Sequence, residues 1–89
     1  MEHRQLRDEL ERLNAELRQA ASLDDEEREM LRSLATEIEE LLARDNVRPH
    51  HYSGLNERLK GAVARLEASH PQVTLLMRRV IDSLSYLGI

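Results

Sequence analysis

The residues best suited to chemistry in this 89-residue chain are its four histidines, because the chain contains no cysteine. They are His3, His50, His51 and His70. A zinc site on a helix ordinarily uses two histidines four residues apart with a carboxylate nearby, and no two of these histidines have that spacing. His50 and His51 are adjacent, and we expect their side chains to diverge from a solvated loop. The sequence therefore predicts neither a metal site nor a cofactor.

Nucleophilic or acid–base catalysis has no better support from the sequence. The serines lie at expected helix starts or on polar faces, and no nucleophile-elbow motif surrounds any of them. Adjacent carboxylates such as Glu26-Glu27 and Glu39-Glu40 are typical of solvated helical faces. With only 2% aromatic residues and no pattern that indicates a pocket, we predict that the protein is not an enzyme and has no catalytic residues.

His70 and Pro71 form a candidate kink or polar switch, because the histidine occupies an apolar position of a helical repeat. One interpretation is a polar break, in which the imidazole bonds to a backbone carbonyl that the proline has freed. The other is a pH-sensitive or register-fixing contact between chains. We favour the polar break.

Charge is divided unevenly along the chain, whose net charge is −4. Residues 1–44 carry 13 acidic and 7 basic side chains, whereas residues 45–89 carry 4 acidic and 6 basic ones. An acidic total disfavours nucleic acid as the main partner, because phosphate neutralisation supplies most non-specific affinity for it. We expect the acidic half to lie against the basic half, within one chain or between chains.

The elements that must position these residues are helices. Apolar residues recur at steps of three and four, and glycine and proline are scarce, which predicts one all-α domain over residues 1–89. We expect helices at about 3–20, 24–44, 54–69 and 71–87, with a loop at 45–53. Ser22 or Asp24 can cap the second of these helices, and Gly88 can end the last.

The last two of these segments share one apolar seam, whose nine residues follow steps of four and three without interruption. The seam consists of Leu59, Val63, Leu66, His70, Val73, Met77, Val80, Leu84 and Leu87. Such spacing is typical of a helix that packs against a partner along its whole length. This seam is the candidate surface for self-association.

Pro71 lies inside the seam, where it removes one helical hydrogen bond and clashes with the carbonyl of Glu67. A kink preserves the shared phase of the two halves, whereas a reversal at Ser69-His70 needs a very tight turn. We therefore expect an N-terminal antiparallel helical hairpin plus a long C-terminal helix that is kinked or broken near Pro71, in a coiled-coil-like bundle. The alternative is a compact four-helix bundle.

A C-terminal rod of about 50 Å would be longer than the first two helices, which are about 27–30 Å each. The surplus seam would stay uncovered in a lone chain, and single chains rarely expose such a patch. We therefore expect a homo-oligomer, a dimer or higher. No uninterrupted apolar run is long enough to span a membrane, and residues 1–5 lack an apolar signal core, so we expect a cytoplasmic protein.

The order of the segments resembles a family of short bacterial proteins catalogued as domain of unknown function 4404. The similar pieces are the leucine-rich opening helix, Ser22-Leu23-Asp24-Asp25-Glu26-Glu27-Arg28, Leu66-Glu67-Ala68-Ser69-His70-Pro71, and the ending Leu87-Gly88-Ile89. The resemblance implies a bacterial, all-helical, stand-alone protein. It transfers no activity.

Two functions of different classes remain open from the sequence. The first is a small cytoplasmic oligomerisation or adaptor protein that binds itself and another protein through its helical surfaces. The alternative is a regulatory nucleic-acid-associated protein that uses its basic C-terminal half. The residues that would carry the alternative are Arg58, Arg65, Arg78 and Arg79.

Overall fold

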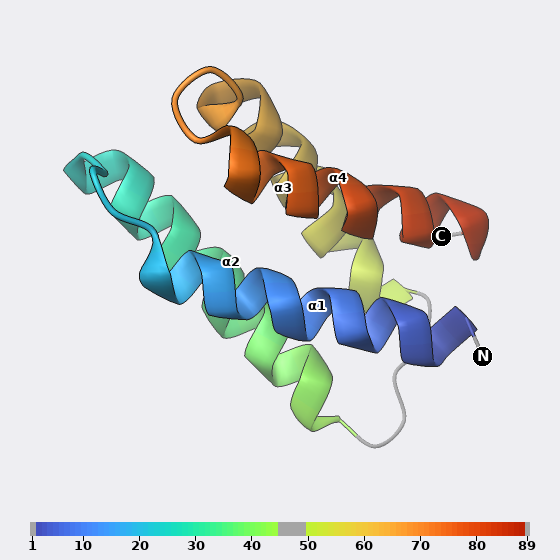
Figure 1. Ribbon diagram of the computed structural model, residues 1–89. Coiled ribbons are helices and arrows are strands. Elements are labelled where there is room, and N and C mark those ends of the chain that lie inside the picture. The colour runs from blue at the N-terminus through green and yellow to red at the C-terminus, as the bar shows by residue number, and fades with distance from the viewer. Residues whose placement is uncertain (1, 45–49, 89) are drawn as a thin grey trace.

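The computed structural model describes residues 2–44 and 50–88, and they form four helices (Figure 1). These helices are α1 (Glu2–Gln19), α2 (Asp25–Ala43), α3 (His50–Leu66) and α4 (Pro71–Tyr86). Over the described ranges the chain contains no strand. The prediction of an all-α chain is confirmed.

The four helices pack as a ring around a shared core. Helix α1 packs against α2 and α4, and α3 packs against the same two neighbours. In the described part of the chain, no Cα of α1 lies within 8 Å of a Cα of α3, and none of α2 lies that close to α4, so these pairs lie on the diagonals. Both ends of the chain lie at the same end of the bundle (Figure 1). Each helix therefore buries one stripe and leaves an outer face to solvent.

Helix α2 begins at a capping box. The Asp24 carboxylate accepts a hydrogen bond from the Glu27 backbone N–H at 2.7 Å, and the Glu27 carboxylate accepts one from the Asp24 N–H at 3.0 Å. Two otherwise unpaired backbone donors are thereby satisfied. Of the two expected caps, Asp24 is the one used. Ser22 instead adopts a left-handed conformation, with φ 59°, in the connection from α1.

The chain reverses between α3 and α4, so the expected kinked C-terminal rod is wrong and the compact four-helix alternative fits. The backbone N–H groups of Ser69 and His70 both donate to the carbonyl of Leu66, at 3.2 and 2.7 Å, and close α3. Pro71 then occupies the first turn of α4, where its missing N–H costs nothing. The bundle extends 35 Å along its longest axis, which is shorter than the expected rod.

The apolar positions of α3 and α4 follow one continuous spacing, and this spacing does not distinguish a kinked rod from a reversal. The connection contains four residues, Glu67–His70, and one helical turn contains almost the same number. A tight reversal and a continuous helix therefore leave the same spacing in the sequence. Both α3 and α4 bury one stripe in the same core, so their apolar positions stay in step.

Helix α3 begins at His50, one turn before the expected residue 54. Of the expected loop at 45–53, residues 45–49 lie outside the described residues, and residues 50–53 are helical. The reason is Tyr52, which is buried three residues before the buried Leu55 and extends the apolar stripe. Ser53 does not cap the helix; its hydroxyl donates to the His50 carbonyl at 3.0 Å.

The core is built from one stripe of each helix. Its buried apolar members are Leu6, Leu10, Leu13, Leu17, Leu31, Leu34, Ala35, Ile38, Leu41, Tyr52, Leu55, Leu59, Ala62, Leu66, Val73, Met77, Val80 and Leu84. Thr74 is also buried, and its hydroxyl donates to the Pro71 carbonyl at 3.0 Å. Apolar burial on this scale supplies the main stabilisation of the bundle.

Candidate functional site

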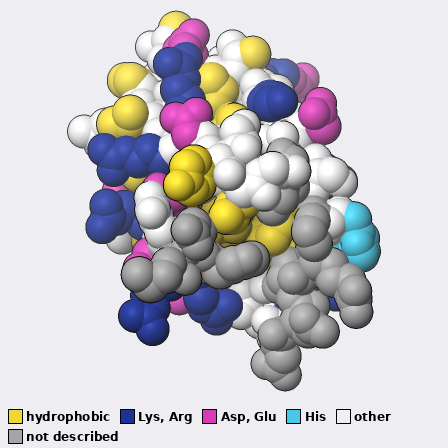
Figure 2. All heavy atoms as spheres, turned by 90° about the vertical axis from the view of Figure 1, so that its right-hand side faces the viewer, with side chains coloured by type: hydrophobic (Ala, Val, Ile, Leu, Met, Phe, Trp, Pro, Cys, Tyr) yellow, Lys and Arg dark blue, Asp and Glu magenta, His cyan; other side chains and the backbone are white. Residues whose placement is uncertain are grey.

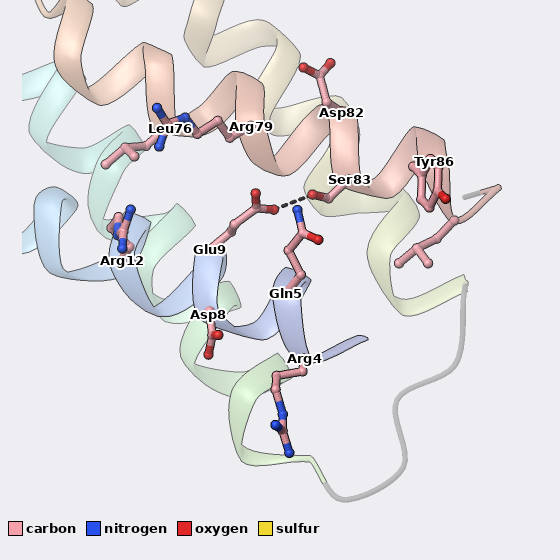
Figure 3. A pocket seen from close by; sticks show the side chains of 11 residues that line it. Arg4, Gln5, Asp8, Glu9, Arg12, Leu76, Arg79, Asp82, Ser83 and Tyr86 are labelled. Carbon is pink, nitrogen blue, oxygen red and sulfur yellow. Dashed lines mark hydrogen bonds between the residues drawn. The ribbon is translucent and has the colours of Figure 1, made fainter. Parts of the chain in front are cut away.

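A groove lies between α1 and α4 (Figure 3). It is open to solvent and has a volume of about 1050 Å³. Its lining residues are Arg4, Gln5, Asp8, Glu9, Arg12, Leu76, Arg79, Asp82, Ser83, Tyr86 and Leu87. The two walls come from opposite ends of the sequence and meet because α1 and α4 are neighbours in the ring.

One hydrogen bond crosses the groove. The Ser83 hydroxyl on α4 donates to the Glu9 carboxylate on α1, and the Gln5 side chain points toward the same place (Figure 3). Leu76 and Leu87 lie on the α4 wall and are packed partly against the core. The groove therefore combines a small apolar wall with one polar contact at its centre.

The charged side chains of the groove balance one another in number but do not pair. Three of its cations and two of its carboxylates make no ion pair or hydrogen bond within the described residues: Arg4, Arg12, Arg79, Asp8 and Asp82. Elsewhere the bundle pairs its charges across helices, as Arg18 does with Glu39. The rim of the groove thus offers both signs of charge to a partner.

Two large apolar side chains stand out on the outer surface of α4. Leu75 is 52% exposed to solvent and Tyr86 is 80% exposed. Figure 2 shows hydrophobic side chains at the surface of the end that carries both termini, with charged side chains of both signs around them. Single exposed apolar residues are common on proteins, but two of them on one helix, one of which lines a groove with unpaired charges, indicate a contact surface.

The apolar seam predicted for self-association lies in the core of one chain. Leu59, Leu66, Val73, Met77, Val80 and Leu84 are buried there. Val63 and Leu87 pack against that core and are partly buried, and His70 is partly exposed. This corrects the assignment of the seam as a surface open to another chain, because α1 and α2 already cover it. Self-association itself stays a prediction.

His70 links the two turns at one end of the bundle. Its Nε2 lies 3.1 Å from the carbonyl oxygen of Ala21, which can only accept, so Nε2 donates. Its Nδ1 lies 2.9 Å from the Ser69 hydroxyl oxygen, within hydrogen-bond distance. The imidazole bonds to a backbone carbonyl, but not to the one that the polar-break interpretation predicted. The carbonyl belongs to the α1–α2 connection and not to the neighbourhood of Pro71.

His50 and His51 do not diverge as expected, because they lie in the first turn of α3 and not in a loop. Their ring centroids are 4.2 Å apart, with the planes tilted by 55°. Across residues 2–44 and 50–88, no three His, Asp or Glu side chains are grouped closely enough to hold a metal ion. The structure therefore brings the two rings together, and among the described residues they belong to no group of three potential metal ligands.

The arginines of the nucleic-acid alternative are mostly engaged with carboxylates. Arg58 pairs with Glu37 at 2.8 Å, and Arg65 pairs with Glu26. Both pairs join basic α3 to acidic α2, which confirms that the acidic half lies against the basic half.

The two arginines of α4 differ in their contacts. Arg78 pairs with Glu67, just after α3. Of the four, only Arg79 makes no ion pair with a described residue.

Two titratable groups outside the groove have pKa values that their surroundings shift. The Arg18 guanidinium, hydrogen-bonded to Glu39, lowers the pKa of that exposed carboxyl, and the Asn14 amide adds to the effect. Burial raises the pKa of the Tyr52 phenol, because the charged phenolate is poorly solvated there. Both shifts have structural causes and do not indicate catalysis.

The outer face of α4 was not predicted from the sequence as a contact surface. Leu75, Arg79, Asp82 and Tyr86 follow steps of four, three and four, which places them on one side of a helix. This is the same spacing that revealed the buried seam. A search for mixed apolar and charged stripes, and not only for apolar ones, could have found this face.

Comparison with known proteins agrees with the resemblance read from the segments. A protein-family model described as "Domain of unknown function (DUF4404)" matches residues 6–89. No curated protein and no solved structure matches the chain. Within the described residues, no helix has the length and apolar character needed to cross a membrane.

Proposed function

We propose that this chain, which belongs to the family described as Domain of unknown function (DUF4404), acts as a small helical oligomerisation or adaptor protein through the α1–α4 face. The observation that carries the proposal is the position of Leu75 and Tyr86. Both are large and exposed on α4, and Tyr86 also lines the groove. Burying them against another protein would gain hydrophobic free energy that the isolated chain forgoes.

The composition of the groove supports a protein partner over a small molecule. Binding sites for small molecules are concave and mostly apolar, with polar groups that converge on the ligand. This groove is open, and its unpaired charges lie along the rim, as Figure 3 shows for Arg4 and Asp82. An exposed tyrosine surrounded by charges of both signs is typical of protein interfaces.

A second hollow, on α2 and α3, gives a useful contrast. Its volume is about 490 Å³, and every residue that lines it is polar or charged. It offers no exposed large apolar side chain to bury. The proposal therefore assigns the contact to α4 and leaves the outer face of α2 in solvent.

Site-specific photo-crosslinking tests the proposal. A benzophenone amino acid replaces Tyr86 in one protein and Ser33, exposed on α2, in a matched control. Illumination of cell extract containing the first protein should give a discrete covalent protein adduct, and the control should give none. Adding Leu75→Asp to the first protein should abolish the adduct, since a charge then enters the contact.

Equal crosslinking from positions 86 and 33, or none from position 86, would contradict the proposal. The nucleic-acid alternative predicts a different result. Binding to phosphates should collapse between low and moderate salt, whereas a contact anchored by Leu75 and Tyr86 should lose much less of its affinity. The same extract, fractionated at both salt concentrations, therefore distinguishes the two functions.

A further inference from the structure

The exposed face of α4 has an order of residues that is complementary to itself. Along the helix the order is Leu75, Arg79, Asp82 and Tyr86, and all four side chains are exposed. The spacing is symmetric about the point between Arg79 and Asp82: Leu75 lies four residues before Arg79, and Tyr86 lies four residues after Asp82. An apolar group therefore lies at each end of the face, with a cation and an anion between them.

A second copy of α4 laid antiparallel on this face would match it group for group. A two-fold axis between Arg79 and Asp82 places Tyr86 of one copy opposite Leu75 of the other. The same operation places each Arg79 opposite an Asp82. Interfaces with two-fold symmetry repeat every contact twice, so one favourable pair in the sequence gives two in the dimer.

The ion pairs inside the chain support a second copy of the chain as the partner of this face. The neighbouring Arg78 already forms an ion pair with Glu67. Arg58 and Arg65 likewise form ion pairs with carboxylates of α2. Arg79 and Asp82 have no ion-pair partner among the described residues. A parallel second copy would instead place Arg79 against Arg79, which is repulsive.

We infer that two copies of this chain pair through the outer face of α4, antiparallel about a two-fold axis, with Leu75 packed on Tyr86 and Arg79 paired with Asp82 of the other copy. The inference rests on the proposed function and specifies its first partner. The face contributes few residues per copy, so the interface is small. Small interfaces of this kind form weak dimers whose population depends on concentration.

Charge exchange tests this arrangement, because the symmetry makes an unusual prediction for mixtures. In the Arg79→Asp dimer, the new carboxylate at position 79 of each copy faces the Asp82 carboxylate of the other. In the Asp82→Arg dimer, the new guanidinium group at position 82 of each copy faces Arg79 of the other. Each variant should dimerise at least about tenfold more weakly than the wild type, as sedimentation velocity measures over a concentration series. An equimolar mixture of the two variants should form a heterodimer nearly as tight as the wild-type dimer, because every site again pairs opposite charges.

Matched controls separate the pairing from general charge effects. Arg32→Asp makes the same change of net charge on α2 and should leave dimerisation unchanged. The double variant Arg79→Asp/Asp82→Arg should dimerise like the wild type. Circular dichroism should show unchanged helix content throughout, because all the substituted side chains are exposed.

A wild-type chain that stays monomeric at every concentration would overturn the inference, as would a mixture no more associated than its separate components. Neither result alone removes the proposed function. If the Tyr86 crosslink then captures a different protein, the α4 face remains a contact surface with another occupant. If that crosslink also captures nothing, both proposals fail.

Discussion

At the scale of single residues, α3 contains two glycines in its interior that the fold does not require. A Cβ at Gly54 would lie 3.6 Å from Oε2 of Glu37, and one at Gly61 would meet nothing within 4 Å. Gly88 is different, because its φ of +81° lies in the left-handed region at the end of α4. The conformational freedom of glycine is thus needed after α4 and not inside α3.

We predict that Gly61→Ala raises the free energy of unfolding by about 1 kcal/mol, since alanine reduces the entropy of the unfolded chain and favours the helix. Denaturation in urea measures the change. Gly88→Ala serves as the opposite control and should lower stability, because alanine is strained at that φ. A loss of stability from Gly61→Ala would mean that another chain approaches α3 closely at this point.

Tyr52 gives the bundle a sensitivity to alkaline pH. Its pKa is raised in the folded state, so the folded protein holds the phenolic proton more tightly than the unfolded chain does. The stabilisation is fully present below the unfolded pKa of about 10 and is lost as pH rises through the folded value. We predict that Tyr52→Phe reduces the fall in thermal stability above pH 10. An unchanged pH profile in this variant would show that the phenol is solvated.

At the scale of elements, the two turns at one end of the bundle are joined by the ring of His70. The bond from Nε2 to the Ala21 carbonyl connects residues 49 positions apart. We predict that His70→Ala lowers the free energy of unfolding by about 1 kcal/mol, the usual net value of one such hydrogen bond. His50→Ala, at an exposed position in the first turn of α3, should change stability by less than about 0.5 kcal/mol. Equal effects of the two substitutions would contradict the link.

Pro71 acts as a helix-start residue and not as a kink. Its fixed φ suits the first turn of α4, and it lowers the entropy of the unfolded chain. We predict that Pro71→Ala costs about 0.5–1 kcal/mol and leaves the compact bundle intact. Small-angle X-ray scattering, extrapolated to low concentration where the chain is monomeric, should give an unchanged radius of gyration, near the 12.3 Å of the Cα trace. A clear increase would indicate that α3 and α4 fuse into one rod.

At the scale of the whole molecule, one core serves all four helices, so a charge anywhere in it acts on the entire fold. Val80 is fully buried between α4 and its neighbours. We predict that Val80→Asp unfolds the chain or lowers its stability by several kcal/mol, because an unpaired charge is buried. Circular dichroism and thermal denaturation measure the loss. A well-folded Val80→Asp monomer would instead indicate that the seam joins chains, as the sequence first suggested.

The helices, their caps and the buried stripe could be predicted from the sequence because each depends on residues close together in it. The repeat of leucines defines α1 and α2, Asp24 and Glu27 form the capping box across three residues, and Gly88 ends α4. The start of α3 was missed by one turn, because Tyr52 was not counted in the apolar stripe. Most of the bundle's local structure is thus determined by residues that lie close together in the sequence.

Tertiary structure alone decided which surfaces meet. The seam from Leu59 to Leu87 has the same spacing whether the chain kinks or reverses, since the turn at Glu67–His70 has nearly the length of one helical turn. Periodicity shows that a stripe must be covered, but it does not show whether the cover is another helix of the same chain or a second chain. The α1–α4 groove likewise exists only because the ring brings the two ends of the chain together, and long-range packing determines that closure.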